Sequence, residues 1–135
     1  MGTLGRFLVR YWPSLCVVGV IMYATFNSDP LADVDVPLFP GADKLIHAIM
    51  FGGLAGAVAF DYQRADRTLN RLTRSAMLAI CGWCAVAGVL DEIAQATLTA
   101  ERSGDILDWF ADCGGIAVAY FTAPPAIRKV LGHRS

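Results

Sequence analysis

Charged residues are scarce in this sequence, and their scarcity argues against an ordinary soluble domain. Asp, Glu, Lys and Arg make up 17% of the 135 residues, while hydrophobic residues make up 56%. An average soluble domain has about 25% charged residues. Together with the mean hydropathy of +0.49, several uninterrupted apolar runs predict an integral membrane protein. The net charge of −1 says little about partners.

Other features are also missing from the chain. Without a long linker, an internal repeat or a low-complexity segment, residues 1–135 are expected to form one membrane domain. The basic segment 61–75 lacks interleaved aromatic residues, so no nucleic-acid partner is expected. All four cysteines lie in apolar runs, which argues against a disulfide framework or a zinc knuckle. Cys81 and Cys84 form a C-x-x-C without a second ligand pair, so they are interpreted as small packing residues.

Four apolar runs are long enough to cross a membrane as helices, because about 20 residues span the hydrocarbon core. They lie at about residues 10–27, 44–61, 76–98 and 105–123 and predict an all-α, integral membrane four-helix bundle. No small-x-small cleavage site follows the first run, which favours an anchor helix over a signal peptide. Pro13 is expected in the first turn of that helix, and Pro124 and Pro125 are expected to end the last one. Ala48, Gly52 and Gly56 form a small-xxx-small stripe that allows a neighbouring helix to approach closely.

Basic residues are nearly absent from the segments that join the first helix to the second and the third to the fourth. Nine of the eleven Lys and Arg residues lie near the N-terminus, in segment 61–75 or in the tail after residue 123. The positive-inside rule therefore places both termini in the cytoplasm, and segments 27–43 and 99–104 on the outer side.

Acidic residues interrupt the apolar runs where they should be costly, since a charge in a bilayer costs at least about 2.5–3.5 kcal/mol. At about 100° per residue, the polar residues of each of three helices share one face, within an arc of about 100°. At 1.5 Å per residue, His47, Glu92 and Asp112 lie roughly 5–10 Å inside the outer boundary. The sequence therefore predicts one outward-facing polar site. Its expected members are Asp43, Lys44, His47, Asp91, Glu92, Gln95, Arg102, Asp105, Asp108 and Asp112.

A purely structural network is the competing interpretation of these residues. Lys44 or Arg102 could pair with aspartates and Gln95 could form an interhelical hydrogen bond, all in the service of helix assembly. However, the acids outnumber the bases, so some carboxyl groups must be protonated, solvated or bound to a cation or a cationic ligand. No cofactor or metal-ligand motif is assigned, although a divalent cation could fill this role.

Three ordered motifs resemble those of the VanZ-like membrane proteins. The first is D-K-x-x-H-x-x-x-F, the second is E-x-x-Q, and the third begins at an arginine and contains an aspartate and a glycine. Their residues here are Asp43, Lys44, His47, Phe51, Glu92, Gln95, Arg102, Asp108 and Gly115. The resemblance covers about residues 40–121. Asp112 and Ala119 depart from it, since Asn and Gly are usual at these two positions.

The resemblance implies a small, multi-pass protein of the bacterial cytoplasmic (inner) membrane with a polar site on the outer, periplasmic side. The family is named for a protein associated with low-level resistance to teicoplanin, a glycopeptide antibiotic. Membership implies no known reaction, and it does not show that this chain confers resistance.

Two functions are carried forward, and the sequence leaves open whether the protein is an enzyme. The first is binding or modulation of a cell-envelope lipid, a lipid-linked precursor or an amphipathic glycopeptide-type antibiotic. The second is hydrolysis or group transfer on a lipid-linked substrate, with His47 as base and Glu92 and Asp108 as acid or cation ligands. No Ser or Cys lies on the same faces at a matching depth, which disfavours a covalent mechanism. A proton- or ion-coupled transporter fits less well, because no ionisable residue is expected in the inner half of a span. The oligomeric state is not predicted.

Overall fold

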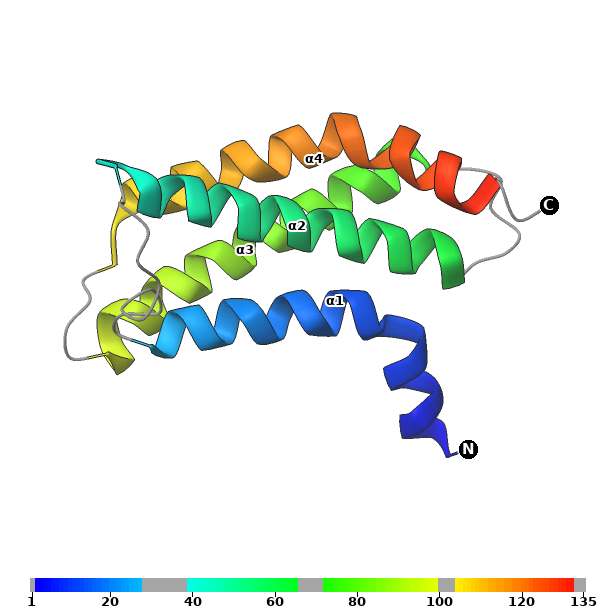
Figure 1. The fold of residues 1–135 in the computed structure, drawn as a ribbon, viewed down its shortest axis with the longest axis horizontal. Coiled ribbons are helices and arrows are strands. Elements are labelled where there is room, and N and C mark those ends of the chain that lie inside the picture. The colour runs from blue at the N-terminus through cyan, green and yellow to red at the C-terminus, as the bar shows by residue number, and fades with distance from the viewer. Residues whose placement is uncertain (1, 28–38, 66–71, 100–103, 133–135) are drawn as a thin grey trace.

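Four helices make up the fold of the computed structural model, which describes residues 2–27, 39–65, 72–99 and 104–132. They are α1 (Thr3–Phe26), α2 (Ala42–Ala65), α3 (Arg74–Leu98) and α4 (Ile106–Gly132). The described residues contain no strand. All four helices are long and apolar enough to cross a membrane. The predicted all-α four-helix bundle is confirmed, and the chain is a multi-pass membrane protein (Figure 1).

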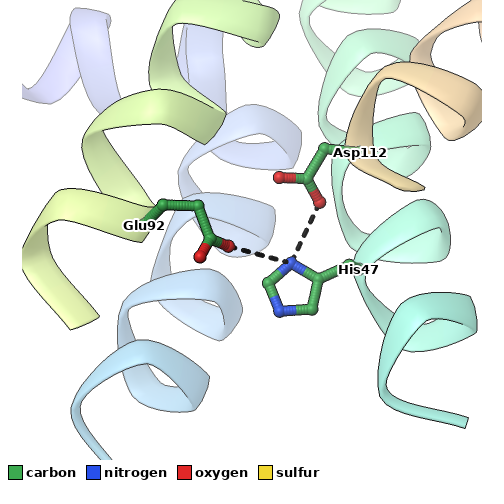
Figure 2. Close-up of side chains that lie close together, drawn as sticks. All are labelled: His47, Glu92 and Asp112. Atoms are coloured by element: carbon green, nitrogen blue, oxygen red, sulfur yellow. Dashed lines mark hydrogen bonds and ion pairs between the residues drawn. The ribbon is translucent and has the colours of Figure 1, made fainter. Parts of the chain in front are cut away.

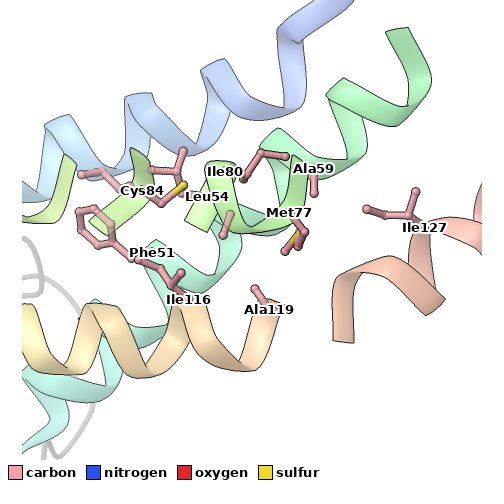
Figure 3. Close-up of a cluster of buried hydrophobic side chains, with 11 residues drawn as sticks. Phe51, Leu54, Ala59, Met77, Ile80, Cys84, Ile116, Ala119 and Ile127 are labelled. Carbon is pink, nitrogen blue, oxygen red and sulfur yellow. The ribbon is translucent and has the colours of Figure 1, made fainter. Parts of the chain in front are cut away.

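The helices enclose a continuous apolar core. Its side chains come mainly from α2, α3 and α4, and Figure 3 shows them pointing into the space between these helices. Cys84 is buried in this core, in agreement with its interpretation as a packing residue. The outer surface is also apolar: Trp83 is 75% exposed and Phe121 is 74% exposed. A soluble monomer rarely shows large apolar patches, whereas lipid contact explains them.

Glycine residues allow α2 and α4 to approach each other closely. A Cβ atom at Gly115 would overlap the carbonyl oxygen of Ala48, and a Cβ at Gly52 would lie 2.8 Å from the carbonyl oxygen of Gly115. Ala48 and Gly52 belong to the predicted small-residue stripe. Gly56 does not extend the contact, because a Cβ there would meet nothing within 4 Å.

Gly115→Ala is therefore expected to separate α2 from α4 and to destabilise the protein by about 1–3 kcal/mol, the usual cost of overpacking. Gly114→Ala is the matched control, since a Cβ at Gly114 meets nothing within 4 Å. Alanine is the better helix former by about 1 kcal/mol, so this control should be neutral or slightly more stable. Thermal unfolding of the detergent-solubilised proteins measures the difference. Equal melting temperatures would show that the close approach is not required.

The prediction that Pro124 and Pro125 end the last helix is wrong, because α4 continues through both residues to Gly132. Each proline removes one hydrogen-bond donor from the helix, which usually costs about 3 kcal/mol or more. Ile127 lies beyond the prolines and is buried in the core near Met77 and Ala59 (Figure 3). Burial of this side chain offsets part of the proline cost and favours continued helix. Similarly, α2 continues to Ala65, beyond the predicted end of the second span at about residue 61.

The position predicted for Pro13 is also wrong, because α1 begins at Thr3 and Pro13 lies in its interior. The helix bends at Tyr11, whose backbone has φ −116° and ψ 19°. Figure 1 shows the first turns of α1 directed away from the bundle. Because proline has no N–H, the carbonyl of Val9 loses its usual i+4 donor. Arg64 of α2 replaces that donor: its Nη2 lies 3.3 Å from the Val9 oxygen.

Asp61 completes the contact between the bend of α1 and the end of α2. Its Oδ2 accepts hydrogen bonds from the backbone N–H of Ser14 at 3.0 Å and from the Ser14 hydroxyl at 2.6 Å. Its Oδ1 pairs with Arg64 at 3.1 Å, and Arg64 also donates to the carbonyl of Arg10. Asp61 is 1% exposed. An ionisable residue is therefore buried in the half of α2 where none was predicted.

Candidate functional site

Polar side chains from three helices meet at the bundle end opposite the two chain ends that Figure 1 marks. His47 of α2, Glu92 of α3 and Asp112 of α4 point toward one another there (Figure 2). The Nδ1 atom of His47 lies 3.0 Å from Oδ1 of Asp112 and 3.9 Å from Oε1 of Glu92. His47 is 3% exposed and Asp112 is fully buried. We call His47, Glu92 and Asp112 the triad.

A glycine makes room for the triad, and a tryptophan side chain fixes the contact between two of the helices that carry it. A Cβ at Gly88 of α3 would lie 2.9 Å from Oδ2 of Asp112, so a larger residue here would require this carboxylate to shift. The indole N–H of Trp109 donates to the carbonyl of Ala85 at 3.0 Å and holds α4 against α3. The position of Asp112 is therefore set by the α3–α4 contact as well as by its partner His47.

Lys44 lies nearer to the surface than the triad, and three carboxylates surround it. Its ammonium nitrogen is 3.1 Å from Asp43, 3.4 Å from Asp105 and 3.0 Å from Asp108. The second oxygen of Asp108 lies 3.8 Å from Nε2 of His47, so Asp108 stands between Lys44 and the triad. Lys44 is half-buried and its charge is balanced locally, which leaves it little capacity to bind an anion by itself.

Asp105 joins α3 to α4 from a position just before the helix in which it was predicted. Its Oδ1 accepts a hydrogen bond from the backbone N–H of Leu107 at 2.9 Å, as an N-terminal helix cap does. Its own N–H donates to Oε2 of Glu92 at 2.7 Å. The Leu107 N–H, assisted by Lys44, lowers the pKa of Asp105 from its usual 3.8. The pKa of Asp105 is lower in the folded state than in the unfolded state, so this contact contributes its full stabilisation above the unfolded-state pKa of 3.8. The contribution is lost as the pH falls through the lowered folded-state pKa.

Asp91 and Gln95 belong to a neighbouring but separate hydrogen-bonded group. Gln95 donates to Oδ2 of Asp91 at 2.9 Å, and the hydroxyl of Thr25 from α1 contacts Oδ1 of Asp91. All three side chains are buried. Since both oxygens of Asp91 have partners within this group, the group attaches α1 to α3.

The structure thus brings together seven of the ten predicted site residues and sets Asp91 and Gln95 beside them. The seven are Asp43, Lys44, His47, Glu92, Asp105, Asp108 and Asp112. Arg102, the tenth, lies outside the described residues. Thr25 was not among the predicted site residues. A hydroxyl near the outer end of the first apolar run was the only signal for Thr25.

The partner of His47 is not the acid nearest to it in the sequence. Asp43, one turn before His47, pairs with Lys44. Asp112 contacts His47 instead, across the α2–α4 interface. A buried carboxylate against one ring nitrogen can fix the tautomer and orientation of a histidine, as required of a general base or a metal ligand.

Two carboxylate oxygens in the triad have no hydrogen-bond partner among the described residues: Oε1 of Glu92 and Oδ2 of Asp112. Buried polar atoms are nearly always partnered, so each of these oxygens requires an explanation. Comparison with protein-family models, curated proteins and solved structures found no match.

Proposed function

We propose that this chain is a small VanZ-like protein of the bacterial inner membrane that binds or modulates a component of the cell envelope. The component would be a lipid, a lipid-linked precursor or an amphipathic glycopeptide-type antibiotic, held by its polar part. The observation that carries the proposal is the convergence of Lys44, Asp108 and the triad at one end of a bundle with an apolar outer surface. These residues include members of all three motifs that resemble the family.

The site's surroundings support a ligand that is partly embedded in the membrane. Each helix that contributes to the triad also exposes a large apolar side chain at a similar depth on its outer surface: Ile49 on α2, Ile93 on α3 and Phe110 on α4. Such side chains match acyl chains, while Lys44 and Asp108 match a polar headgroup. A lipid could therefore place its headgroup at Lys44 without leaving the bilayer.

The charges favour a ligand with an amine, or a phosphate that a cation accompanies. Three carboxylates surround Lys44, and three more acidic residues lie close by: Asp91, Glu92 and Asp112. An isolated anionic phosphate would meet net repulsion at such a site. A primary amine could instead replace the Lys44 ammonium as the partner of Asp108.

The proposed orientation puts this site on the outer side of the membrane. The fold supports it, because α2 and α4 both end, with their basic residues Arg64 and Lys129, at the bundle end opposite His47 (Figure 1). A single cysteine introduced at Asp43, in a variant without the four native cysteines, should react with a membrane-impermeant maleimide in intact spheroplasts. Labelling only after lysis would reverse the orientation.

Lipid retention tests the proposed function. The purified, delipidated protein is incubated with a bacterial lipid extract in detergent, and bound lipids are identified by mass spectrometry. We expect one lipid class to be enriched on the wild type, and the enrichment to fall at least tenfold in Lys44→Gln and Asp108→Asn, which lose the headgroup contacts. Lys129→Gln, at the opposite end of the bundle, is the control and should behave like the wild type. Equal retention of every lipid by all four proteins would refute the proposal.

The contact between His47 and Asp112 supports an integral-membrane hydrolase or transferase as the second candidate. A buried imidazole held at 3.0 Å by a carboxylate can accept a proton from water or from an attacking hydroxyl. Glu92 and Asp108 would then serve as acid or cation ligands. An enzyme would release a water-soluble headgroup from the lipid extract, and His47→Gln would stop the release. Retention without any turnover favours the binding function.

A further inference from the structure

We propose that the triad is a binding site for a divalent transition-metal ion, held by Nδ1 of His47 and by one carboxylate oxygen each from Glu92 and Asp112. A link between this ion and a lipid headgroup rests on the proposed function. Binding of the ion itself depends only on the triad.

The spacing of the three donor atoms is close to that of a metal centre. One ligand atom from each residue can be chosen so that all three lie within 4.8 Å of one another. Ligands at about 2.0–2.2 Å from a zinc ion are separated from one another by roughly 3–3.6 Å. Nδ1 of His47 lies 3.0 Å from Oδ1 of Asp112 and 3.9 Å from Oε1 of Glu92. Small side-chain shifts would bring both separations into this range.

The unpartnered oxygens provide independent support for a ligand. Asp112 is fully buried, and its Oδ2 has no hydrogen-bond partner among the described residues. Figure 2 shows this second carboxylate oxygen turned away from the imidazole, on the side facing Glu92. Oε1 of Glu92 is also without a hydrogen bond. A buried carboxylate oxygen without a partner is destabilising, and one cation held by Oε1 of Glu92 and by the Asp112 carboxylate would give both residues a partner.

Groups around the triad orient its members as the outer shell of a metal site does. The backbone N–H of Asp105 holds Oε2 of Glu92 at 2.7 Å, which leaves Oε1 free for the ion. With an ion on Nδ1, the imidazole proton would lie on Nε2, where the carboxylate of Asp108 is 3.8 Å away. Metal-bound histidines commonly have a carboxylate on the other ring nitrogen.

The donor set indicates the kind of ion and what it would do. One imidazole nitrogen and two carboxylate oxygens suit Zn²⁺ and other first-row transition ions. Three protein ligands leave a coordination position open for water or a ligand. An ion there would supply the positive charge that a phosphate-bearing headgroup needs at this acidic site.

Metal titration tests the inference without any lipid. The full chain is purified in detergent, treated with a chelator and titrated with Zn²⁺ by isothermal calorimetry, with bound metal counted by elemental analysis. We expect one ion per chain, and an affinity at least about a hundredfold lower in Asp112→Asn and in Glu92→Gln. Asp91→Asn is the matched control: its carboxylate is buried one residue before Glu92 but already has two partners, so its affinity should stay within threefold of the wild type.

Co²⁺ provides a second measurement that depends only on the wild type. Its visible spectrum should show d–d bands of a nitrogen- and oxygen-ligated ion without a sulfur-to-metal charge-transfer band, which would indicate Cys81 or Cys84 instead. Failure of the wild type to bind Zn²⁺, or equal binding by Asp112→Asn, would overturn the metal site. Lipid retention with no metal binding overturns this inference alone, whereas metal binding without retention overturns the proposed function alone.

Discussion

Asp61→Ala is expected to lower the free energy of unfolding by about 3–5 kcal/mol, the usual effect of removing one partner of a buried ion pair. The substitution leaves the N–H and hydroxyl of Ser14 without their acceptor and deprives Arg64 of its carboxylate. Arg64 would remain beside the bend of α1 with only backbone carbonyls as partners. The loss is measured by thermal and denaturant unfolding of the protein in detergent, followed by circular dichroism.

Two further variants separate the parts of this contact. Asp61→Asn keeps an acceptor oxygen for Ser14 but loses the charge, so it should fall between the wild type and Asp61→Ala. Arg64→Gln combined with Asp61→Ala should cost less than the sum of the two single changes, because both act on the same contact. If Asp61→Ala changed stability by less than about 0.5 kcal/mol, the buried pair would not hold the bend of α1.

His47→Ala is expected to remove ligand binding almost completely. The imidazole contacts Asp112 and lies within 4 Å of both Glu92 and Asp108. Its removal leaves those carboxylates facing one another without a nitrogen donor. We expect lipid enrichment to fall at least a hundredfold, measured by the same retention experiment.

His47→Gln is the companion variant, because its amide retains a polar contact with Asp112 but provides neither an imidazole base nor its metal-binding nitrogen. It should preserve the melting temperature better than His47→Ala does and still fail to bind. Full retention of the ligand by both variants would mean that the site lies elsewhere on the protein.

The sequence predicted the four helices and the positions of most site residues well. Long apolar runs determine which segments are helical, and a helical phase of about 100° per residue determines which acids share a face. The faces of α2, α3 and α4 that carry His47, Glu92 and Asp112 were identified in this way. The contribution of Gly52 to close packing against α4 also followed from its spacing.

Contacts between distant residues could not be predicted in the same way. Ser14 and Asp61 are 47 residues apart, and Thr25 and Asp91 are 66 apart, so no local pattern relates them. Asp61 resembled a loop residue because four arginines follow it within the next 13 residues. The bend at Tyr11 and the uninterrupted course of α4 through Pro124 depend on tertiary partners, which override local proline preferences.

The most direct test of the account is photo-crosslinking in native membranes. A benzophenone amino acid replaces Asp43, which is half-exposed beside Lys44, or Lys129 at the opposite end of α4. Illumination at position 43 is expected to capture one enriched lipid or precursor class, His47→Ala to abolish the adduct, and position 129 to capture only bulk lipids. Identical adducts at both positions, unaffected by His47→Ala, would contradict a ligand site at this end of the bundle.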